Sequence, residues 1–289
     1  MSEIDAIVLD LDGGSALEEL LSSMEAQTLP FARIIVWDNG SVVPVRERVA
    51  PRRLPLVHGR SEQNLGFTGG IDAAMRLTEA PLVAWINNDV VLAPAWNERL
   101  SARFADARLA AAQSVVLGTD GRIDGAGISI DGGVFRQRGH GLETARLPPG
   151  EPWGISATAA MFRAEALRDA AIGGRLLHPA FFLYYEDVEL SARLRERGWR
   201  LALVGEPLAT HRGSMSAARY PQAELLRVRN RYFVNRLHPG VGSLVELLSE
   251  DAGRLGRRLL RLDLRAAATV LGGVVAGLSA PLRIRSAPP

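Results

Sequence analysis

The feature that most constrains this chain is an apolar run, residues 82–86, that ends abruptly in Asn87, Asn88 and Asp89. A short run without polar interruptions is typical of a strand that is covered on both faces of a parallel sheet. Polar residues that follow such a strand lie at the carboxyl edge of the sheet, where open α/β sheets bind ligands. Taken alone, the tripeptide is more typical of a simple turn, since Asn and Asp side chains hydrogen-bond to nearby backbone.

Asp89 is the candidate metal ligand of this stretch. Mg²⁺ is usually held by one or two carboxylates, and substrate phosphates fill its remaining positions. A single carboxylate at a strand end suits that arrangement, and Asn88 lies beside it at the same edge.

The first 90 residues alternate predicted strands with predicted helices. Apolar runs at 6–9, 33–37 and 54–57 predict strands, whereas helical spacing of apolar residues predicts helices at 16–26 and 71–77. This alternation indicates crossover units and therefore an α/β fold with a mostly parallel sheet flanked by helices.

Polar residues follow several of these strands, namely Asp10, Asp38, Asn64 and the pair at 88–89. Their convergence at one edge predicts a single binding site. Asp38 can accept a hydrogen bond from a nucleobase imide, and the glycines at 66–70 let the backbone approach a ribose or phosphate closely. The same glycines are also typical of a plain tight loop before a helix.

Five motifs, taken in order, resemble family 2 glycosyltransferases, in particular the rhamnosyltransferase-like branch. They are 37–41 (WDNGS), 64–70 (NLGFTGG), 87–90 (NNDV), 184–190 (YYEDVEL) and 210–214 (THRGS), and the similarity extends from residue 4 to about 216. The resemblance implies a GT-A fold, a nucleoside diphosphate sugar as donor, a divalent metal ion (Mg²⁺ or Mn²⁺) and transfer with inversion at the anomeric carbon.

The resemblance also implies roles for individual residues. Asp89 and His211 would contact the metal or the diphosphate, and Asp187 would be the general base. The nucleotide-sugar contacts would be Asp10, Asp38, Asn64, Gly69, Asp72 and Asn88. The chain departs from the usual pattern at 10–12 and 42–44, so the donor stays open between a dTDP-sugar such as dTDP-rhamnose and a UDP-sugar. The expected acceptor is a cell-surface glycan or a glycolipid.

Glu186 and Asp187 are predicted to open a helix that stops at Gly198, directly after the aromatic segment 178–185. Acidic residues in a first helical turn often only complement the helix dipole. An aromatic wall, however, desolvates a carboxylate and raises its pKa toward useful basicity. We therefore favour Asp187 as the catalytic base, with Glu186 as the second candidate, and Tyr185 as an acceptor contact.

The region between the two halves of the motif set is less informative. Residues 125–141 predict a β-rich insertion, which is either a solvated hairpin or, extended to 150, a lid over the acceptor. Trp153 is either a core residue or a platform on which an acceptor sugar stacks. His211 follows a predicted strand at 200–204, and neutral imidazole is a competent metal ligand.

Residues 219–289 form a basic extension with 12 arginines against five acidic residues. Leucines at helical spacing (244, 248, 255, 259 and 262) alternate there with arginines at 254–265. This pattern is typical of a helix in a lipid interface, but the leucines can equally pack on the catalytic domain or on a second copy, giving a homodimer. We expect a catalytic domain at 1–218, divided into a nucleotide-binding half (1–92) and an acceptor half (93–218).

Two alternative functions stay open. Residues 7–14 resemble the opening of haloacid-dehalogenase-type phosphatases, in which a first Asp is the nucleophile. Those enzymes also need a lysine, and all 34 basic residues here are arginine. A catalytically inactive carbohydrate-binding protein is the second alternative, against which the intact Asp89, Asp187 and His211 argue.

The remaining expectations concern location and partners. The chain has no cysteine, no basic segment before its first apolar run and no apolar stretch of roughly 20 residues. We therefore expect a cytoplasmic protein, at the inner face of the cytoplasmic membrane if the basic extension contacts lipid. Nothing in the sequence indicates a nucleic-acid partner.

Overall fold

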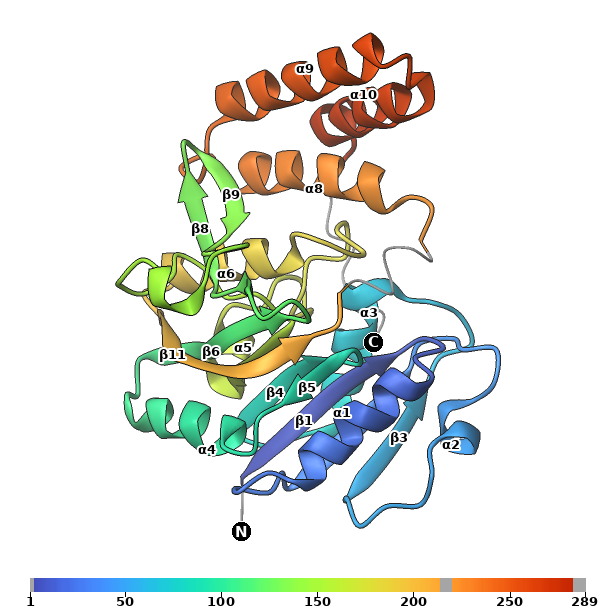
Figure 1. Cartoon of the computed structure of the whole chain (residues 1–289), viewed down its shortest axis with the longest axis vertical. Coiled ribbons are helices and arrows are strands. Elements are labelled where there is room, and N and C mark those ends of the chain that lie inside the picture. Colours follow the sequence, from blue (N-terminus) through green and yellow to red (C-terminus); the bar gives the residue numbers. More distant parts are fainter. Residues whose placement is uncertain (1–2, 214–219, 283–289) are drawn as a thin grey trace.

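The computed structural model describes residues 3–213 and 220–282, and a nine-stranded sheet lies at the centre of this part of the chain (Figure 1). The strand order is β3-β2-β1-β4-β10-β6-β11-β5, and β7 pairs with β6 at the side. The strands are β1 (Ile4–Asp10), β2 (Arg33–Asp38), β3 (Leu56–Arg60), β4 (Leu82–Asn87), β5 (Val90–Leu92), β6 (Leu109–Gly118), β7 (Ile123–Gly125), β10 (Ala159–Arg163) and β11 (Arg200–His211).

The predicted α/β sheet is confirmed. Strands β3, β2, β1 and β4 are all parallel, in register, so that Asp10 and Asp38 lie side by side at the carboxyl edge. Beyond β4 the sheet is mixed, because β10 runs antiparallel to both β4 and β6, while β11 returns parallel to β6.

Helices cover both faces of the sheet. They are α1 (Ser15–Glu25), α2 (Val45–Arg48), α3 (Gly66–Ala74), α4 (Trp96–Ser101), α5 (Ala164–Asp169) and α6 (Glu186–Glu196), with short 3-10 turns at Met75–Leu77, Ala102–Ala105 and Thr144–Arg146. In β1, Ala6 and Val8 belong to the core under α1 and α4, whereas Ile7 belongs to the core under α3, α5 and α6. Both faces are therefore buried, which explains the uninterrupted apolar runs of the sequence.

Two elements differ most from their predicted bounds. Strand β11 is longer than the predicted 200–204, because it continues through an irregularity at Pro207 and ends at His211. Helix α3 begins at Gly66, ahead of the predicted residue 71. The side chain of Asn64 accepts the backbone N–H of Gly66 at 2.8 Å, which satisfies one of the free donors at the start of the helix.

The insertion forms a hairpin of β8 (Ile128–Asp131) and β9 (Val134–Gln137). Ile128 and Phe135 are buried, and the carbonyl of Gly133 accepts a hydrogen bond from the backbone N–H of Ser243 at 2.8 Å. The expectation of a solvated hairpin is therefore wrong for its inner face, because apolar side chains anchor it to the C-terminal helices.

Three helices from the C-terminal part of the chain stack above the sheet: α8 (Ala223–Leu237), α9 (Leu244–Leu260) and α10 (Leu264–Ser279) (Figure 1). Of the leucines at helical spacing, Leu244, Leu248, Leu259 and Leu262 are exposed and Leu255 is half-buried, whereas Leu247, which is not one of them, is buried. No helix within 3–213 or 220–282 is long and apolar enough to cross a membrane.

Glycines allow α10 to lie close to α8. A Cβ atom at Gly273 would come within 2.7 Å of the Cβ of Val228, whereas one at Gly272 would meet only Leu225, at 3.9 Å. We therefore expect Gly273→Ala to lower the free energy of unfolding by about 1–3 kcal/mol, through overpacking, and to loosen α10.

Gly272→Ala is the matched control, since it adds the same methyl group to the same helix in ordinary contact distance. It is expected to be neutral or to stabilise by about 0.5–1 kcal/mol. Chemical denaturation and limited proteolysis of both variants measure the difference, and equal behaviour of the two would contradict the close packing of α8 and α10.

Candidate active site

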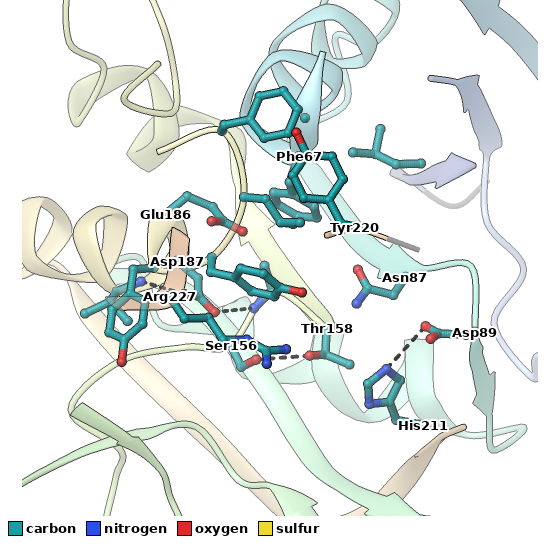
Figure 2. Close-up of a pocket in the computed structure, with 18 of the residues that line it drawn as sticks. Phe67, Asn87, Asp89, Ser156, Thr158, Glu186, Asp187, His211, Tyr220 and Arg227 are labelled. Carbon is teal, nitrogen blue, oxygen red and sulfur yellow. Dashed lines mark hydrogen bonds and ion pairs between the residues drawn. The ribbon is translucent and has the colours of Figure 1, made fainter. Parts of the chain in front are cut away.

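A cavity of about 520 Å³ opens at the carboxyl edge of the sheet. It collects eight of the residues predicted from the sequence: Asp10, Asn64, Asn88, Asp89, Tyr185, Glu186, Asp187 and His211. Figure 2 shows Asp89 and His211 at one side of this cavity, with Glu186 and Asp187 at the other. Residues that lie far apart in the sequence thus meet in one site.

Asp89 and His211 meet because the chain pairs β5 with β11. His211 lies opposite Val90 in this antiparallel pair, and its Nε2 atom is 3.3 Å from Oδ1 of Asp89. On the other side of the ring, Nδ1 lies 2.8 Å from Oδ2 of Asp124. Burial lowers the pKa of His211, but the hydrogen bonds to Asp124 and Asp89 outweigh it and raise this pKa to about 9.

Asp124 was missed in the sequence. It lies in β7, immediately before the insertion, and no motif marks it. The hydrogen bond to His211 is the largest cause of the lowered pKa of Asp124, against the effect of burial. Ser214, the last residue of the motif that contains His211, lies outside the described residues.

The residues at the rim that are predicted to contact the nucleotide sugar form hydrogen bonds with each other or with neighbouring side chains. Asp10 is fully buried, and its carboxylate accepts from Asn88 at 2.8 Å and from Arg48 at 2.6 Å. Asn39 donates to the side chain of Asn64 at 3.1 Å. These bonds fix the amide groups of the rim in defined orientations.

Four predicted site residues do not line the cavity: Asp38, Gly69, Asp72 and Trp153. Asp38 is buried and accepts from the backbone of Ser41 and Val45 and from Arg60. Burial opposes these hydrogen bonds, which together lower the pKa of Asp38.

The other three have packing or backbone contacts. Asp72 caps the backbone N–H of Leu176, and burial raises its pKa. Gly69 lies in the first turns of α3, where a Cβ would come within 2.8 Å of Leu65. Trp153 packs on Phe135, with ring centroids 5.4 Å apart, and Phe135 is the residue that lines the cavity. Their predicted ligand contacts stay predictions.

The two carboxylates at the start of α6 have different environments. Glu186 is buried, and its Oε2 atom has no hydrogen-bond partner among the described residues. Burial, followed by the charge of Asp187, raises the pKa of Glu186 well above its usual range. Asp187 accepts backbone N–H groups from Ala157 and Val188. Burial nonetheless raises the pKa of Asp187 to about 6, so the ionised form of Asp187 predominates at neutral pH.

The loop before α6 has a strained backbone. Phe182, Tyr184 and Tyr185 all have positive φ angles, of 62°, 71° and 68°. Side chains larger than glycine seldom adopt this left-handed region, and such strain persists only where surrounding contacts hold it. The strain ends at Tyr185, the residue that precedes the helix, and so sets where Glu186 and Asp187 point.

Helix α8 supplies the contacts that hold this loop. The buried side-chain amide of Asn230 donates to the carbonyls of Phe181, Leu183 and Tyr184, at 2.9, 2.8 and 2.7 Å. Beside it, Arg229 donates to the carbonyl of Phe181 at 3.1 Å. The boundary expected at 218 therefore separates, in sequence, a helix and a loop that form one structural unit.

Comparison with known proteins agrees with this architecture. The central mixed sheet flanked by helices matches the GT-A fold of glycosyltransferases. The sequence matches glycosyl transferase family 2 over residues 12–170, more than half of its length, and the chain belongs to that family. No curated protein matches it.

Solved structures show the same fold at low identity. TarS 1–349 of S. aureus in complex with UDP-GlcNAc has a TM-score of 0.57 and 17% identity, over 82% of this chain and 65% of that chain. GalNAc-T7 with UDP, GalNAc and Mn²⁺ has a TM-score of 0.63 and 13% identity, over 81% and 47%. The chain thus spans less than two thirds of the length of these proteins.

The hydrogen bonds from Asn230 to the strained loop can be tested directly by substitution. Asn230→Asp keeps the size of the side chain but removes both N–H donors, and leaves the carbonyls of Leu183 and Tyr184 without this partner, whereas the carbonyl of Phe181 keeps Arg229. Since an unsatisfied buried polar group costs about 1–3 kcal/mol, we expect the loop to relax and glycosyl transfer to fall by about tenfold or more.

Donor affinity is expected to change little, because the cavity wall on the β4 side is untouched. Asn235→Asp, on the same helix and away from the loop, is the control. Transfer rates and donor affinity by calorimetry measure both, and a wild-type rate for Asn230→Asp would show that the loop holds its shape without α8.

Proposed function

We propose that this protein is an inverting, metal-dependent glycosyltransferase that moves a sugar from a nucleoside diphosphate donor to an acceptor hydroxyl. The observation that carries the proposal is that one cavity holds a carboxylate with a pKa of about 6, Asp187, together with the Asp89–His211 pair. A base ionised at neutral pH and a diphosphate-binding edge are the two parts that such a transfer requires.

The residues present fit a divalent cation. One oxygen of Asp89 and one nitrogen of His211 lie 3.3 Å apart in the cavity, and Asp124 holds the far side of the imidazole ring. A divalent cation at this pair would displace the proton that His211 donates to Asp89 in the absence of metal. This carboxylate–histidine arrangement is the usual support of a metal-bound histidine. Among the described residues no group of three or more His, Asp or Glu forms a ready cation site. The remaining ligands would therefore come from the donor diphosphate, as is common for Mg²⁺.

When bound, the ion would neutralise negative charge on the departing nucleoside diphosphate. The chain itself supplies the other parts. Asp187 takes the proton of the acceptor hydroxyl, and the backbone N–H groups of Ala157 and Val188 fix its carboxylate. Burial and the charge of Asp187 raise the pKa of Glu186, which favours the protonated form of that carboxyl. A single displacement with the base opposite the leaving group inverts the anomeric carbon.

The donor and acceptor are the least constrained parts of the proposal. The structurally similar TarS was solved with UDP-GlcNAc and GalNAc-T7 with UDP and GalNAc, which favours a UDP-sugar as the donor. The motif resemblance keeps dTDP-rhamnose as the second candidate. Calorimetric titration with a panel of UDP- and dTDP-sugars, with and without Mn²⁺, tests the donor. Analysis of the anomeric configuration of the product tests inversion.

The alternative functions find less support in the site. The phosphatase hypothesis needs Asp10 as a nucleophile, but Asp10 is fully buried and bonded to Arg48 and Asn88. A carbohydrate-binding protein without activity would not require the raised pKa of Asp187. Turnover of a nucleotide sugar excludes both.

The exposed leucines of α9 and the α9–α10 turn support a peripheral contact with the inner face of the cytoplasmic membrane, or a homodimer. Leu260 and Leu262 are 87% and 82% exposed. Sedimentation with anionic vesicles and sedimentation equilibrium without them separate these two partners.

Asp187→Asn keeps the shape and hydrogen bonding of the side chain but cannot accept a proton. We expect the transfer rate to fall by about 10² or more, with donor affinity nearly unchanged. In the wild-type enzyme, kcat/KM should fall about tenfold for each pH unit below 6, because Asp187 must be ionised and its pKa is about 6.

Glu186→Gln is the matched control for that experiment, since Glu186 is already protonated in the proposed mechanism. It is expected to retain most of the rate. If instead Glu186→Gln loses the rate and Asp187→Asn keeps it, Glu186 is the base.

The metal role gives a separate prediction. Asp89→Ala should abolish metal-dependent donor binding while the fold survives, and a chelator should have the same effect on the wild-type protein. Asp124→Asn should weaken Mn²⁺ affinity by about 10–100-fold, because it removes the support of His211. Electron paramagnetic resonance of Mn²⁺ with donor nucleotide measures both the metal-dependent donor binding and the Mn²⁺ affinity. Donor binding by the wild-type protein that is unchanged by the chelator would contradict the role of Asp89.

A further inference from the structure

A second cavity, of about 530 Å³, lies between α8, α9 and α10. We call it the arginine pocket, because six of the nine residues that line it are arginines; the full lining is Tyr185, Glu224, Arg227, Arg231, Arg254, Arg257, Arg258, Arg261 and Val270. Glu224 is the one carboxylate among them. A concave surface with this excess of positive charge is suited to an anion.

The arginines of the pocket lie on one face of α8 and on one face of α9 and its C-terminal end. Arg254, Arg257, Arg258 and Arg261 are spaced at three- and four-residue intervals, which places them on one side of α9 and its end. Arg227 and Arg231 are likewise four residues apart on α8. Positive groups gathered across a shared cavity repel one another unless an anion lies between them.

Only part of this charge is neutralised within the protein. Arg231 is buried and pairs with Glu250 and Asp251, yet its Nε atom has no hydrogen-bond partner among the described residues. Arg258 lies 3.1 Å from Asp263, and Arg254 lies 3.7 Å from Glu250.

The other three arginines, Arg227, Arg257 and Arg261, have no carboxylate within ion-pair distance in 3–213 or 220–282. A guanidinium group binds phosphate oxygens through two parallel hydrogen bonds. Three guanidinium groups without a carboxylate partner in one cavity therefore favour a phosphate or diphosphate ligand over a single carboxylate.

The arginine pocket adjoins the active site. Tyr185 and Arg227 line both cavities, and the guanidinium of Arg227 lies over the ring of Tyr184, 4.3 Å from its centroid. Figure 2 shows Arg227 on the same side of the active site as Asp187. An anionic group in the arginine pocket is therefore beside the acceptor end of the active site, across the cavity from Asp89.

An apolar surface lies next to the arginine pocket. Leu259, Leu260, Leu262 and Leu264, at the turn from α9 to α10, are 48%, 87%, 82% and 66% exposed. They alternate in sequence with Arg258 and Arg261. A phosphate that carries an apolar chain would meet both surfaces at once.

We propose that the arginine pocket binds the phosphate or diphosphate group of an anionic acceptor and thereby presents the acceptor's hydroxyl to Asp187. The proposal deepens the proposed function and rests on it. The two sources of such a group are a lipid-linked sugar and a soluble phosphate ester, and the adjoining leucines favour the lipid.

The test uses the full chain and two probes, farnesyl diphosphate and inorganic pyrophosphate, titrated by calorimetry in the presence of a chelator. The chelator keeps either diphosphate from binding with a metal at Asp89. Arg257→Gln/Arg261→Gln removes two unpaired forks from the arginine pocket. Arg76→Gln/Arg265→Gln removes the same charge from exposed positions outside it and is the control.

We expect the wild-type protein and the control to bind the probes with salt-dependent affinity. The pocket variant should bind them about tenfold to a hundredfold more weakly, the size expected for lost hydrogen bonds to charged groups. Tighter binding of farnesyl diphosphate than of pyrophosphate identifies a lipid-linked source, whereas equal binding identifies a soluble one.

Equal affinity of the pocket variant and the wild type, or no binding of either probe to the wild type, would overturn the proposal. Donor binding is measured separately with a nucleotide sugar and Mn²⁺ on the same samples. Failure of the proposed function appears as absent donor binding in every sample, and failure of the arginine pocket as intact donor binding with unchanged diphosphate affinity.

Discussion

The side-chain amide of Asn230 is the interaction on which the site depends most. One amide group satisfies three carbonyls of a loop whose backbone, at Phe182, Tyr184 and Tyr185, is strained. Without that partner the loop would keep its strain and lose the hydrogen bonds at Leu183 and Tyr184, and Arg229 would still donate to the carbonyl of Phe181. The direction in which α6 presents Asp187 thus depends on a residue 43 positions later in the chain.

The two adjacent carboxylates show how environment separates similar groups. Burial acts on both Glu186 and Asp187, but only Asp187 receives backbone N–H groups from Ala157 and Val188. These hydrogen bonds favour the ionised form and hold its pKa to about 6, whereas Glu186 also experiences the charge of its neighbour. Two acidic residues next to each other in sequence therefore lie in different electrostatic environments.

Much of this arrangement could be predicted from the sequence, because it follows from local patterns. The apolar run before Asn87 shows a doubly covered strand, and parallel pairing then brings Asp10 and Asp89 to one edge. Asp124 and Asn230 could not be found in this way. Each is an isolated polar residue whose partner lies far away in the sequence; Asp124 and His211 are 87 positions apart. A periodic pattern of apolar residues does not predict such a contact.

The attachment of the β8–β9 hairpin to the start of α9, through Gly133 and Ser243, has a consequence for how this enzyme can diversify. The hairpin supplies Phe135 to one cavity, and α8 and α9 supply the arginines of the other. The insertion, the loop before α6 and the C-terminal helices therefore form one packed unit, apart from the sheet edge that carries Asp10 and Asp89. Exchange of the last 70 residues alone between relatives would break this unit, so the two sides of the molecule can evolve separately only if the hairpin and the helices are inherited together.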